Sequence, residues 1–159
     1  MELRKFIPPA ATAFFPSALR EKMYGELWQK SQIDVAVRDH EDALAIKTHP
    51  LPYLELLFNV TNRLPVTMQI FGAHVEIWLG KPVVVFSTFI SDSFRAGEKR
   101  EGLRAYTFLN NFQSELLNPP KKSAPPSNVS IVLTVSCRSS LGLVEKTIRS
   151  SWLPPKILP

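Results

Sequence analysis

The spacing of hydrophobic residues changes along the chain, and its first regular stretch is helical. Leu19, Met23 and Leu27 recur every four residues, which places them on one face of a helix. Ser17 precedes them and is a residue type that favours the N-cap position. This pattern predicts an amphipathic helix over residues 17–30.

From Arg63 onward the hydrophobic period shortens to two residues, the period of a half-buried strand. The alternation predicts strands over residues 66–70 and 75–79, separated by a break at Gly72. A β-branched run over residues 83–90 predicts a third strand, of the kind found at the centre of a sheet. Because the connections are short, we expect the three strands to form an antiparallel meander.

The second half of this region predicts two helices and one more strand. Apolar residues spaced by three and four positions predict a helix over residues 101–117, ended by Asn118-Pro119-Pro120. A strand is predicted over 129–135 and a short helix over 142–150. The expected fold class is therefore α/β, with a mixed sheet in the order β-β-β-α-β-α and one helix-covered face.

Most of the fourteen prolines mark the borders of this domain, because they gather near both ends, at Pro50 and Pro52, and in one connector at 119–128. We expect an N-terminal extension over residues 1–62, a domain over 63–150 and a proline-rich tail over 151–159. Within the extension, residues 31–62 have no clear pattern apart from a short apolar stretch, Leu54–Val60.

Composition narrows the class of protein. With 45% hydrophobic residues, 21% charged residues and a net charge of +5, the chain suits a basic, soluble single domain with an anionic partner. Cys137 is the single cysteine, which excludes an internal disulfide and a cysteine-cluster zinc site. The longest apolar run, Pro82–Ile90, is far shorter than the ~20 residues that a membrane-spanning helix needs.

The sequence contains no catalytic or cofactor motif. His40, His49 and His74 lie far apart, and no phosphate-binding glycine loop is present. His74 falls on the polar face of its predicted strand, which favours a surface histidine. Cys137 precedes Arg138, and a thiol enzyme using this cysteine is one alternative, although a structural cysteine is favoured. We expect no enzymatic activity, no cofactor and no metal.

Basic residues cluster at one place, where Arg95, Lys99, Arg100 and Arg104 fall within ten residues. Cations at the start of a helix suit phosphate groups, so this segment is a candidate for contact with RNA. An ordinary solvated loop is the alternative, because Glu98 dilutes the cluster.

Short elements over Leu54–Ile148 resemble the ribosomal protein L-eighteen family of the large subunit, the proteins that hold 5S ribosomal RNA, and the mitochondrial branch most closely. They occur in the family's order and are Leu54-Glu55-Leu56-Leu57, Arg63-Leu64-Pro65-Val66, His74-Val75-Glu76-Ile77, Gly80-Lys81-Pro82-Val83-Val84 with Ser87-Thr88, and Gly142-Leu143-Val144. The loop at 136–140 departs from the Asp-Arg-Gly-Gly-like sequence of bacterial members, which leaves open the RNA that is contacted.

The resemblance implies a structural constituent of the mitochondrial large ribosomal subunit, located in the matrix and placed in the central protuberance. Its partners would be ribosomal RNA and, through the proline-rich tails, neighbouring ribosomal proteins, with no membrane and no small-molecule substrate. The residues expected to face RNA are Arg63, Lys81, Arg95, Lys99, Arg100, Arg104 and Arg138. The alternative is a soluble accessory subunit of a mitochondrial respiratory-chain or ATP-synthase complex, which would bind protein rather than RNA.

Overall fold

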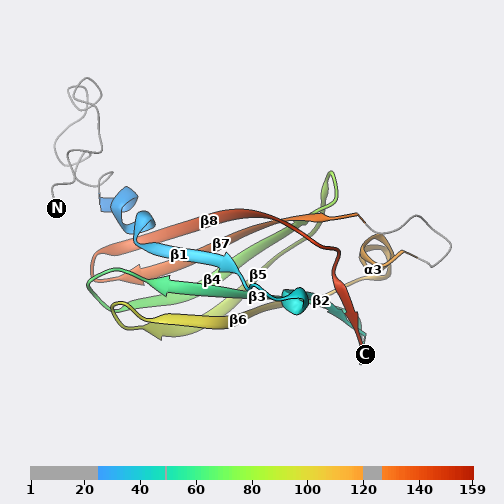
Figure 1. Cartoon of the computed structure of the whole chain (residues 1–159), viewed down its shortest axis with the longest axis horizontal. Helices are drawn as coiled ribbons and strands as arrows, with labels where there is room; N and C mark the ends of the chain where they lie inside the picture. The colour runs from blue at the N-terminus through green and yellow to red at the C-terminus, as the bar shows by residue number, and fades with distance from the viewer. Residues whose placement is uncertain (1–24, 49, 120–126) are drawn as a thin grey trace, which may run out of the picture.

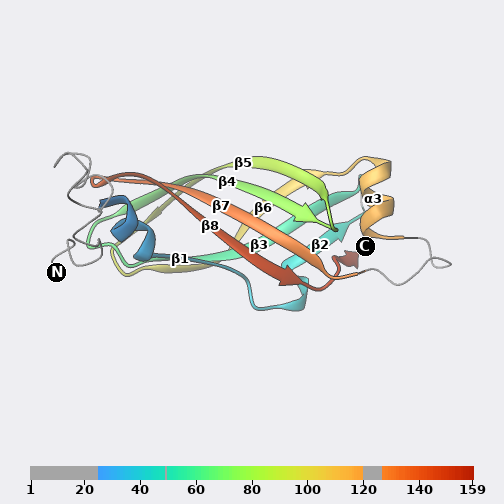
Figure 2. The ribbon, with the colours of Figure 1, turned by 90° about the horizontal axis from the view of Figure 1, so that it is seen from above.

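The computed structural model describes residues 25–48, 50–119 and 127–159, and these form two β-sheets packed face to face. Figure 1 shows the strands of both sheets, and Figure 2 shows them after a turn of 90°. The larger sheet has five strands: β1 (Ile33–Val37), β2 (Leu44–Lys47), β3 (Tyr53–Asn62), β6 (Lys99–Phe108) and β9 (Lys156–Leu158). The smaller sheet has four: β4 (Met68–Trp78), β5 (Pro82–Phe94), β7 (Val129–Ser139) and β8 (Gly142–Trp152).

Strand β3 organises the larger sheet. Strands β1 and β2 pair with successive halves of β3, and β6 pairs with it antiparallel on the other side. Strand β9 pairs with β2 in parallel, so this sheet is mixed. The smaller sheet is antiparallel throughout, in the order β5-β4-β7-β8.

The core lies between the sheets because each long strand turns alternate residues inward. Inward residues of the two central strands β3 and β4 are almost inaccessible to solvent, and they include Leu54, Leu56, Phe58, Val60, Met68, Ile70, Val75 and Ile77. Strand β7 adds Ile131, Leu133, Val135 and Cys137 to the same cluster.

The remaining elements are short. A 3-10 turn, η2 (Glu41–Ala43), precedes β2, and helix α3 (Asn111–Leu117) follows β6. Residues 25–31 are helical and lie at the end of the sandwich opposite α3 (Figure 1). This helix overlaps the predicted helix over 17–30, of which residues 17–24 lie outside the described part of the chain.

The mixed sheet and the presence of both helix and strand agree with the predicted class, but the protein is mostly β. The predicted helix over 101–117 is wrong in its first half, which forms β6. Leu103 and Ala105 point into the core, while Arg104 and Tyr106 alternate with them on the outside. The helix starts only after Asn110, whose side chain caps it in a capping box with Gln113.

The predicted helix over 142–150 is also wrong, because these residues form β8. Strand β8 pairs antiparallel with β7 along its whole length. Val144 and Ile148 are four residues apart, a spacing that fits one face of a helix and equally one face of a strand. The strand predicted over 129–135 is confirmed within the longer β7.

The predicted meander is corrected as well. The two strands predicted over 66–70 and 75–79 are the single strand β4, in which a bulge at Phe71 replaces the expected break at Gly72. The strand predicted over 83–90 lies in β5, which is an edge strand of its sheet rather than a central one. Its β-branched residues therefore include exposed side chains such as Val85.

The segments expected to flank the domain contain parts of the larger sheet. Residues 33–62, expected as extension, form β1, β2 and β3, and the stretch Leu54–Val60 lies within β3. The expected tail over 151–159 holds the end of β8 and all of β9. Residues 120–126 of the connector lie outside the described part of the chain.

Candidate functional site

Five of the seven predicted RNA-facing residues gather at one end of the sandwich. Strand β3 ends there, β4 starts, β5 ends and β6 starts, as the pairings of Met68 with Phe94 and of Thr61 with Lys99 show. The five residues are Arg63, Arg95, Lys99, Arg100 and Arg138. Lys81 lies at the opposite end in the β4–β5 turn, and Arg104 lies along β6. The fold thus groups some of the cations and separates the others.

Acidic side chains neutralise three of these five cations. Arg63 binds Asp34 at 2.8 Å, and Lys99 binds Glu101 at 3.3 Å. Arg100 is the most constrained: it contacts a carboxylate oxygen of Asp92 at 2.8 Å and Oε1 of Glu98 at 3.4 Å.

The Arg100 guanidinium also lies 4.6 Å from the centre of the buried Phe94 ring and donates to the carbonyl of Ser93. Its surroundings are therefore those of a structural arginine that holds the β5–β6 connection.

Three of the other four predicted residues, Arg138, Lys81 and Arg95, differ in their contacts. The Arg138 guanidinium stacks on the Phe71 ring, 5.2 Å from its centre, on the outer face of the smaller sheet. Lys81 and Arg95 form no side-chain ion pair with any residue of the described segments.

A second surface, on the outer face of the larger sheet, combines aromatic rings with cations. Its residues come from β2, β3 and β6, where the alternation that buries one face turns these side chains outward. We call it the aromatic–cationic platform, and it consists of Lys47, Tyr53, Glu55, Arg104, Tyr106 and Phe108.

The rings of the platform contact one another and the cations. The Tyr53 ring packs edge to face against Tyr106 and Phe108, with centroids 6.2 and 6.1 Å apart. The Arg104 guanidinium lies 4.7 Å from the centre of the Tyr106 ring, and the Lys47 ammonium lies 5.9 Å from that of Tyr53. Phe108 remains 61% exposed although it is a large apolar side chain.

Glu55 is the anion at the centre of the platform. It is buried, and its carboxylate contacts the Lys47 ammonium at 3.4 Å and binds Arg104. Desolvation would lower the pKa of Arg104, but the hydrogen bond and the charge of Glu55 outweigh it and raise that pKa above its ordinary value. Two cations around one carboxylate leave the platform with a net positive charge.

Sequence reasoning found Arg104 but missed the aromatic residues around it. The predicted helix over 101–117 assigned Phe108 to a buried helical face. The alternation of Leu103, Ala105 and Thr107 with Arg104, Tyr106 and Phe108 was the available signal for a strand.

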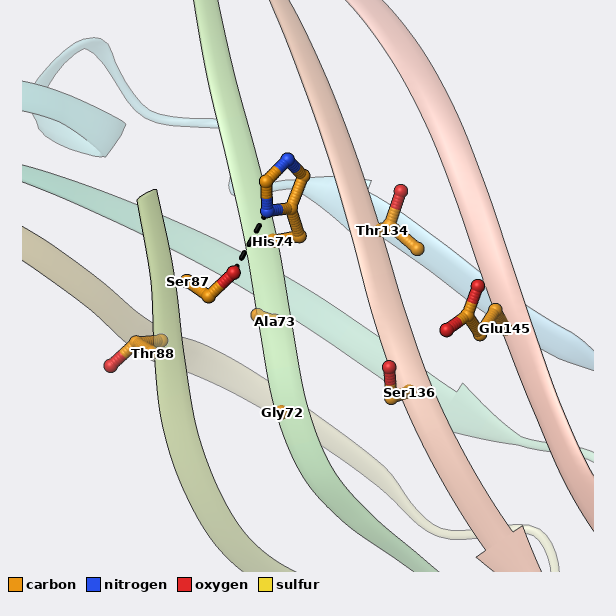
Figure 3. A pocket seen from close by; sticks show the side chains of 8 residues that line it. All are labelled: Gly72, Ala73, His74, Ser87, Thr88, Thr134, Ser136 and Glu145. Atoms are coloured by element: carbon orange, nitrogen blue, oxygen red, sulfur yellow. Dashed lines mark hydrogen bonds between the residues drawn. The ribbon is translucent and has the colours of Figure 1, made fainter. Parts of the chain in front are cut away.

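The outer face of the smaller sheet carries a shallow polar groove of about 410 Å³. It is lined by Gly72, Ala73, His74, Ser87, Thr88, Thr134, Ser136 and Glu145 (Figure 3). A hydrogen bond of 2.8 Å joins Nδ1 of His74 to Oγ of Ser87. His74 is thus on the outer face, as its strand position predicts.

The contacts of His74 form a row of serine, histidine and glutamate. Its Nε2 lies 3.5 Å from a carboxylate oxygen of Glu76, and the other oxygen of Glu76 accepts from Trp78 at 2.9 Å. His74 and Ser87 face each other across the β4–β5 pairing, and both line the groove.

Cys137 does not have the environment of a nucleophile. It is buried in the core, and burial raises the pKa of its thiol to about 12, which favours the unreactive protonated form. In the part of the chain that the structure describes, no group of three or more His, Cys, Asp or Glu side chains is placed to hold a metal. No helix among the described residues has the length and apolarity to cross a membrane.

Comparisons with known proteins leave the function open. No protein-family model matches the sequence, and no curated protein does. A crystal structure of a protein from Archaeoglobus fulgidus is 13% identical and has a TM-score of 0.48, covering 79% of this chain and 97% of that one. An X-ray structure of a structural-genomics target is 11% identical with a TM-score of 0.47, covering 82% and 89%. Likeness at this level carries no information about function.

Proposed function

We propose that this protein is a non-catalytic structural protein that binds RNA through the aromatic–cationic platform. The observation that carries the proposal is the exposure of Tyr106 and Phe108, 46% and 61%, on a sheet face that also holds Lys47 and Arg104.

The platform has both components of a surface for unpaired RNA. Proteins that bind single strands combine cations along the backbone with aromatic rings on which bases stack, at about 1–3 kcal/mol per base. Phe108 contacts Tyr53 edge to face, which leaves a ring face for a base. Lys47 and Arg104 lie close enough to serve the adjoining phosphates.

The particle that contains this RNA is a separate part of the proposal. The sequence resemblance to the L-eighteen family supports the mitochondrial large ribosomal subunit, with ribosomal RNA and neighbouring ribosomal proteins as partners. The resemblance rests on short sequence elements only, since strands replace the first half of the helix predicted over 101–117 and the whole of the helix predicted over 142–150. The platform does not depend on that family's topology.

RNA binding is tested by fluorescence anisotropy with a labelled 12-nucleotide oligouridine at several salt concentrations. We expect the double variant Tyr106→Ala with Phe108→Ala to bind at least ten times more weakly, because two stacking surfaces are lost. Glu55→Gln should bind more tightly and with a steeper salt dependence, because it removes the anion between two cations. Phe112→Ala is the matched control, since Phe112 is an exposed aromatic residue of helix α3.

Equal RNA affinity of the wild type and the Tyr106/Phe108 double variant would refute the platform. The particle is tested by sedimentation of the native protein. Release from the large ribosomal subunit by ribonuclease and high salt supports the ribosomal assignment. Migration with a detergent-extracted membrane complex instead supports an accessory subunit of a respiratory-chain or ATP-synthase complex.

A further inference from the structure

The groove on the smaller sheet exists because one position in the middle of its outer face has no side chain. The strand register places Phe89, Gly72, Ser136 and Glu145 in one row across β5, β4, β7 and β8. The neighbouring row carries Ser87, His74, Thr134 and Thr147. Because Gly72 has no side chain, its position in the first row is a hollow beside the second row, and Figure 3 shows the polar side chains around it.

The lining has a definite chemical character. Ser87, Thr134 and Ser136 offer hydroxyl groups, His74 offers an imidazole, and Glu145 offers a carboxylate. Among the described residues that line the groove there is no lysine or arginine, so the fixed charge of the lining is the negative charge of Glu145, which disfavours a phosphate or another anion. The scarcity of apolar side chains in the lining argues equally against a lipid chain.

The strand partner of Gly72 on β5 is an aromatic residue, next to the lining residues Ser87 and Thr88. Phe89 lies directly across from Gly72 in the ladder and is 82% exposed, more than any other large hydrophobic side chain in the described part of the chain. An exposed ring beside clustered hydroxyl, imidazole and carboxylate groups suits a ligand with one apolar face and many hydroxyl groups. The volume of about 410 Å³ falls within the range of small-molecule sites.

We propose that this groove binds a neutral polyhydroxylated ligand, a saccharide unit, with its ring against Phe89 and its hydroxyl groups toward Glu145, His74 and Ser136. Glu145 accepts hydrogen bonds from two adjacent hydroxyl groups, and the Ser136 hydroxyl donates or accepts according to the ligand. This site is on the opposite sheet from the aromatic–cationic platform and is independent of RNA binding.

Gly72 provides a test that separates the site from the fold. A Cβ atom added there would meet the backbone oxygen of Thr88 at 3.5 Å, an ordinary van der Waals contact, and the backbone does not need a glycine conformation. Gly72→Ala is therefore compatible with β4. Gly72→Val adds two methyl groups beyond that Cβ atom, and valine has a higher strand propensity than alanine. These substitutions fill the hollow without removing any group from the core.

The experiment is an NMR titration of the ¹⁵N-labelled full chain with maltohexaose, cellohexaose, chitohexaose and xylohexaose, each to about 10 mM. We expect at least one of them to shift the amide signals of Gly72, His74, Ser136 and Glu145. Gly72→Val should weaken that binding at least tenfold without lowering the melting temperature, and Glu145→Gln should weaken it severalfold. Glu101→Gln is the control, because Glu101 is an exposed carboxylate of the other sheet.

Two results would overturn the proposal: the absence of shifts at the groove with all four sugars, or shifts that Gly72→Val leaves unchanged. Inorganic phosphate or oligouridine producing the same shifts would also overturn it, since the lining then recognises an anion. Gly72→Val should bind oligouridine like the wild type, so failure of the groove and failure of the platform are separate outcomes.

Discussion

The buried side chain of Asn62 offers the strongest test of how the basic end of the sandwich is held together. Its amide nitrogen lies 3.0, 3.2 and 3.1 Å from the carbonyl oxygens of Val66, Phe94 and Arg95. Its amide oxygen accepts a hydrogen bond from the backbone N–H of Leu64 at 3.0 Å. Asn62 is fully buried, so it ties the β3–β4 connection to the end of β5.

The cost of removing this side chain follows from its hydrogen bonds. The amide has two hydrogens for three carbonyls, so it makes two full donations in addition to the one acceptance. At about 1 kcal/mol per hydrogen bond, Asn62→Ala should destabilise the protein by about 3 kcal/mol. For a domain of this size that corresponds to a melting temperature lower by roughly 6–12 °C.

Asn62→Asp should be worse than Asn62→Ala near neutral pH. The substitution replaces the amide donor by a carboxylate, which faces three carbonyl oxygens in the protein interior. These surroundings raise the pKa of the introduced carboxyl above its value in the unfolded chain. A raised pKa in the folded state means that the folded protein binds the proton more tightly. The stability of Asn62→Asp should therefore recover as the pH falls from 7 toward 5.

The assay is urea denaturation followed by tryptophan fluorescence, with Asn59→Ala as the matched control. Asn59 is on the same strand but on its outer face, and its side chain accepts a single hydrogen bond, from the Gly102 N–H at 3.0 Å. We expect the control to lose about 1 kcal/mol. A loss below 1 kcal/mol in both Asn62 variants, or no recovery of Asn62→Asp at lower pH, would refute this account of the basic end.

Two further predictions concern Cys137 and β9. Burial raises the pKa of the Cys137 thiol to about 12, so iodoacetamide at pH 8 should label the native protein only as fast as the protein unfolds. Urea should make the labelling rapid. Labelling is followed by mass spectrometry, and fast labelling of the native protein would show that the thiol is accessible. Lys156 tethers β9 to Asp42, with 2.8 Å between the charged atoms, and its hydrogen bond lowers the pKa of Asp42 below 3.8. Because the pKa of Asp42 is lower in the folded protein than in the unfolded chain, this ion pair contributes stability above the unfolded pKa and loses it as pH falls through the folded pKa. Asp42→Asn should therefore lower, at pH 6, the protection factor of the Thr48 N–H against hydrogen exchange, as acid should do in the wild type. An unchanged Thr48 protection factor in Asp42→Asn would show that the pairing of β9 does not depend on Asp42.

The strands of the core were predictable where burial on one face is strict. Positions Val75 and Ile77 of β4, and Leu133 and Val135 of β7, alternate with polar residues, and the structure buries them all. Prediction failed where the same apolar spacing fits both periods. In β8, Val144 and Ile148 satisfy a helix and a strand alike, and only pairing with β7 decides between them.

The candidate site was less predictable because its parts come from distant strands. The sequence near Arg100 does not show that Asp92 will form an ion pair with its guanidinium or that the guanidinium will lie over the Phe94 ring. Nor does the sequence show that Asp34 will bind Arg63. The platform depends on the register between β3 and β6, which places Tyr53 opposite Phe108. Tertiary packing sets the register between two such strands, so the hydrophobic pattern within each strand does not predict it.

The two central strands β3 and β4 follow each other in the chain but lie in different sheets. Each pairs with a strand that comes much later in the sequence: β3 pairs with β6, and β4 pairs with β7. Neither sheet can be completed by a contiguous half of the polypeptide. Such nonlocal pairing slows folding, so we expect refolding in milliseconds to seconds. During that interval the apolar faces of β3 and β4 are open to other molecules, and a chaperone that shields them should raise the yield of native protein more than a lower temperature would.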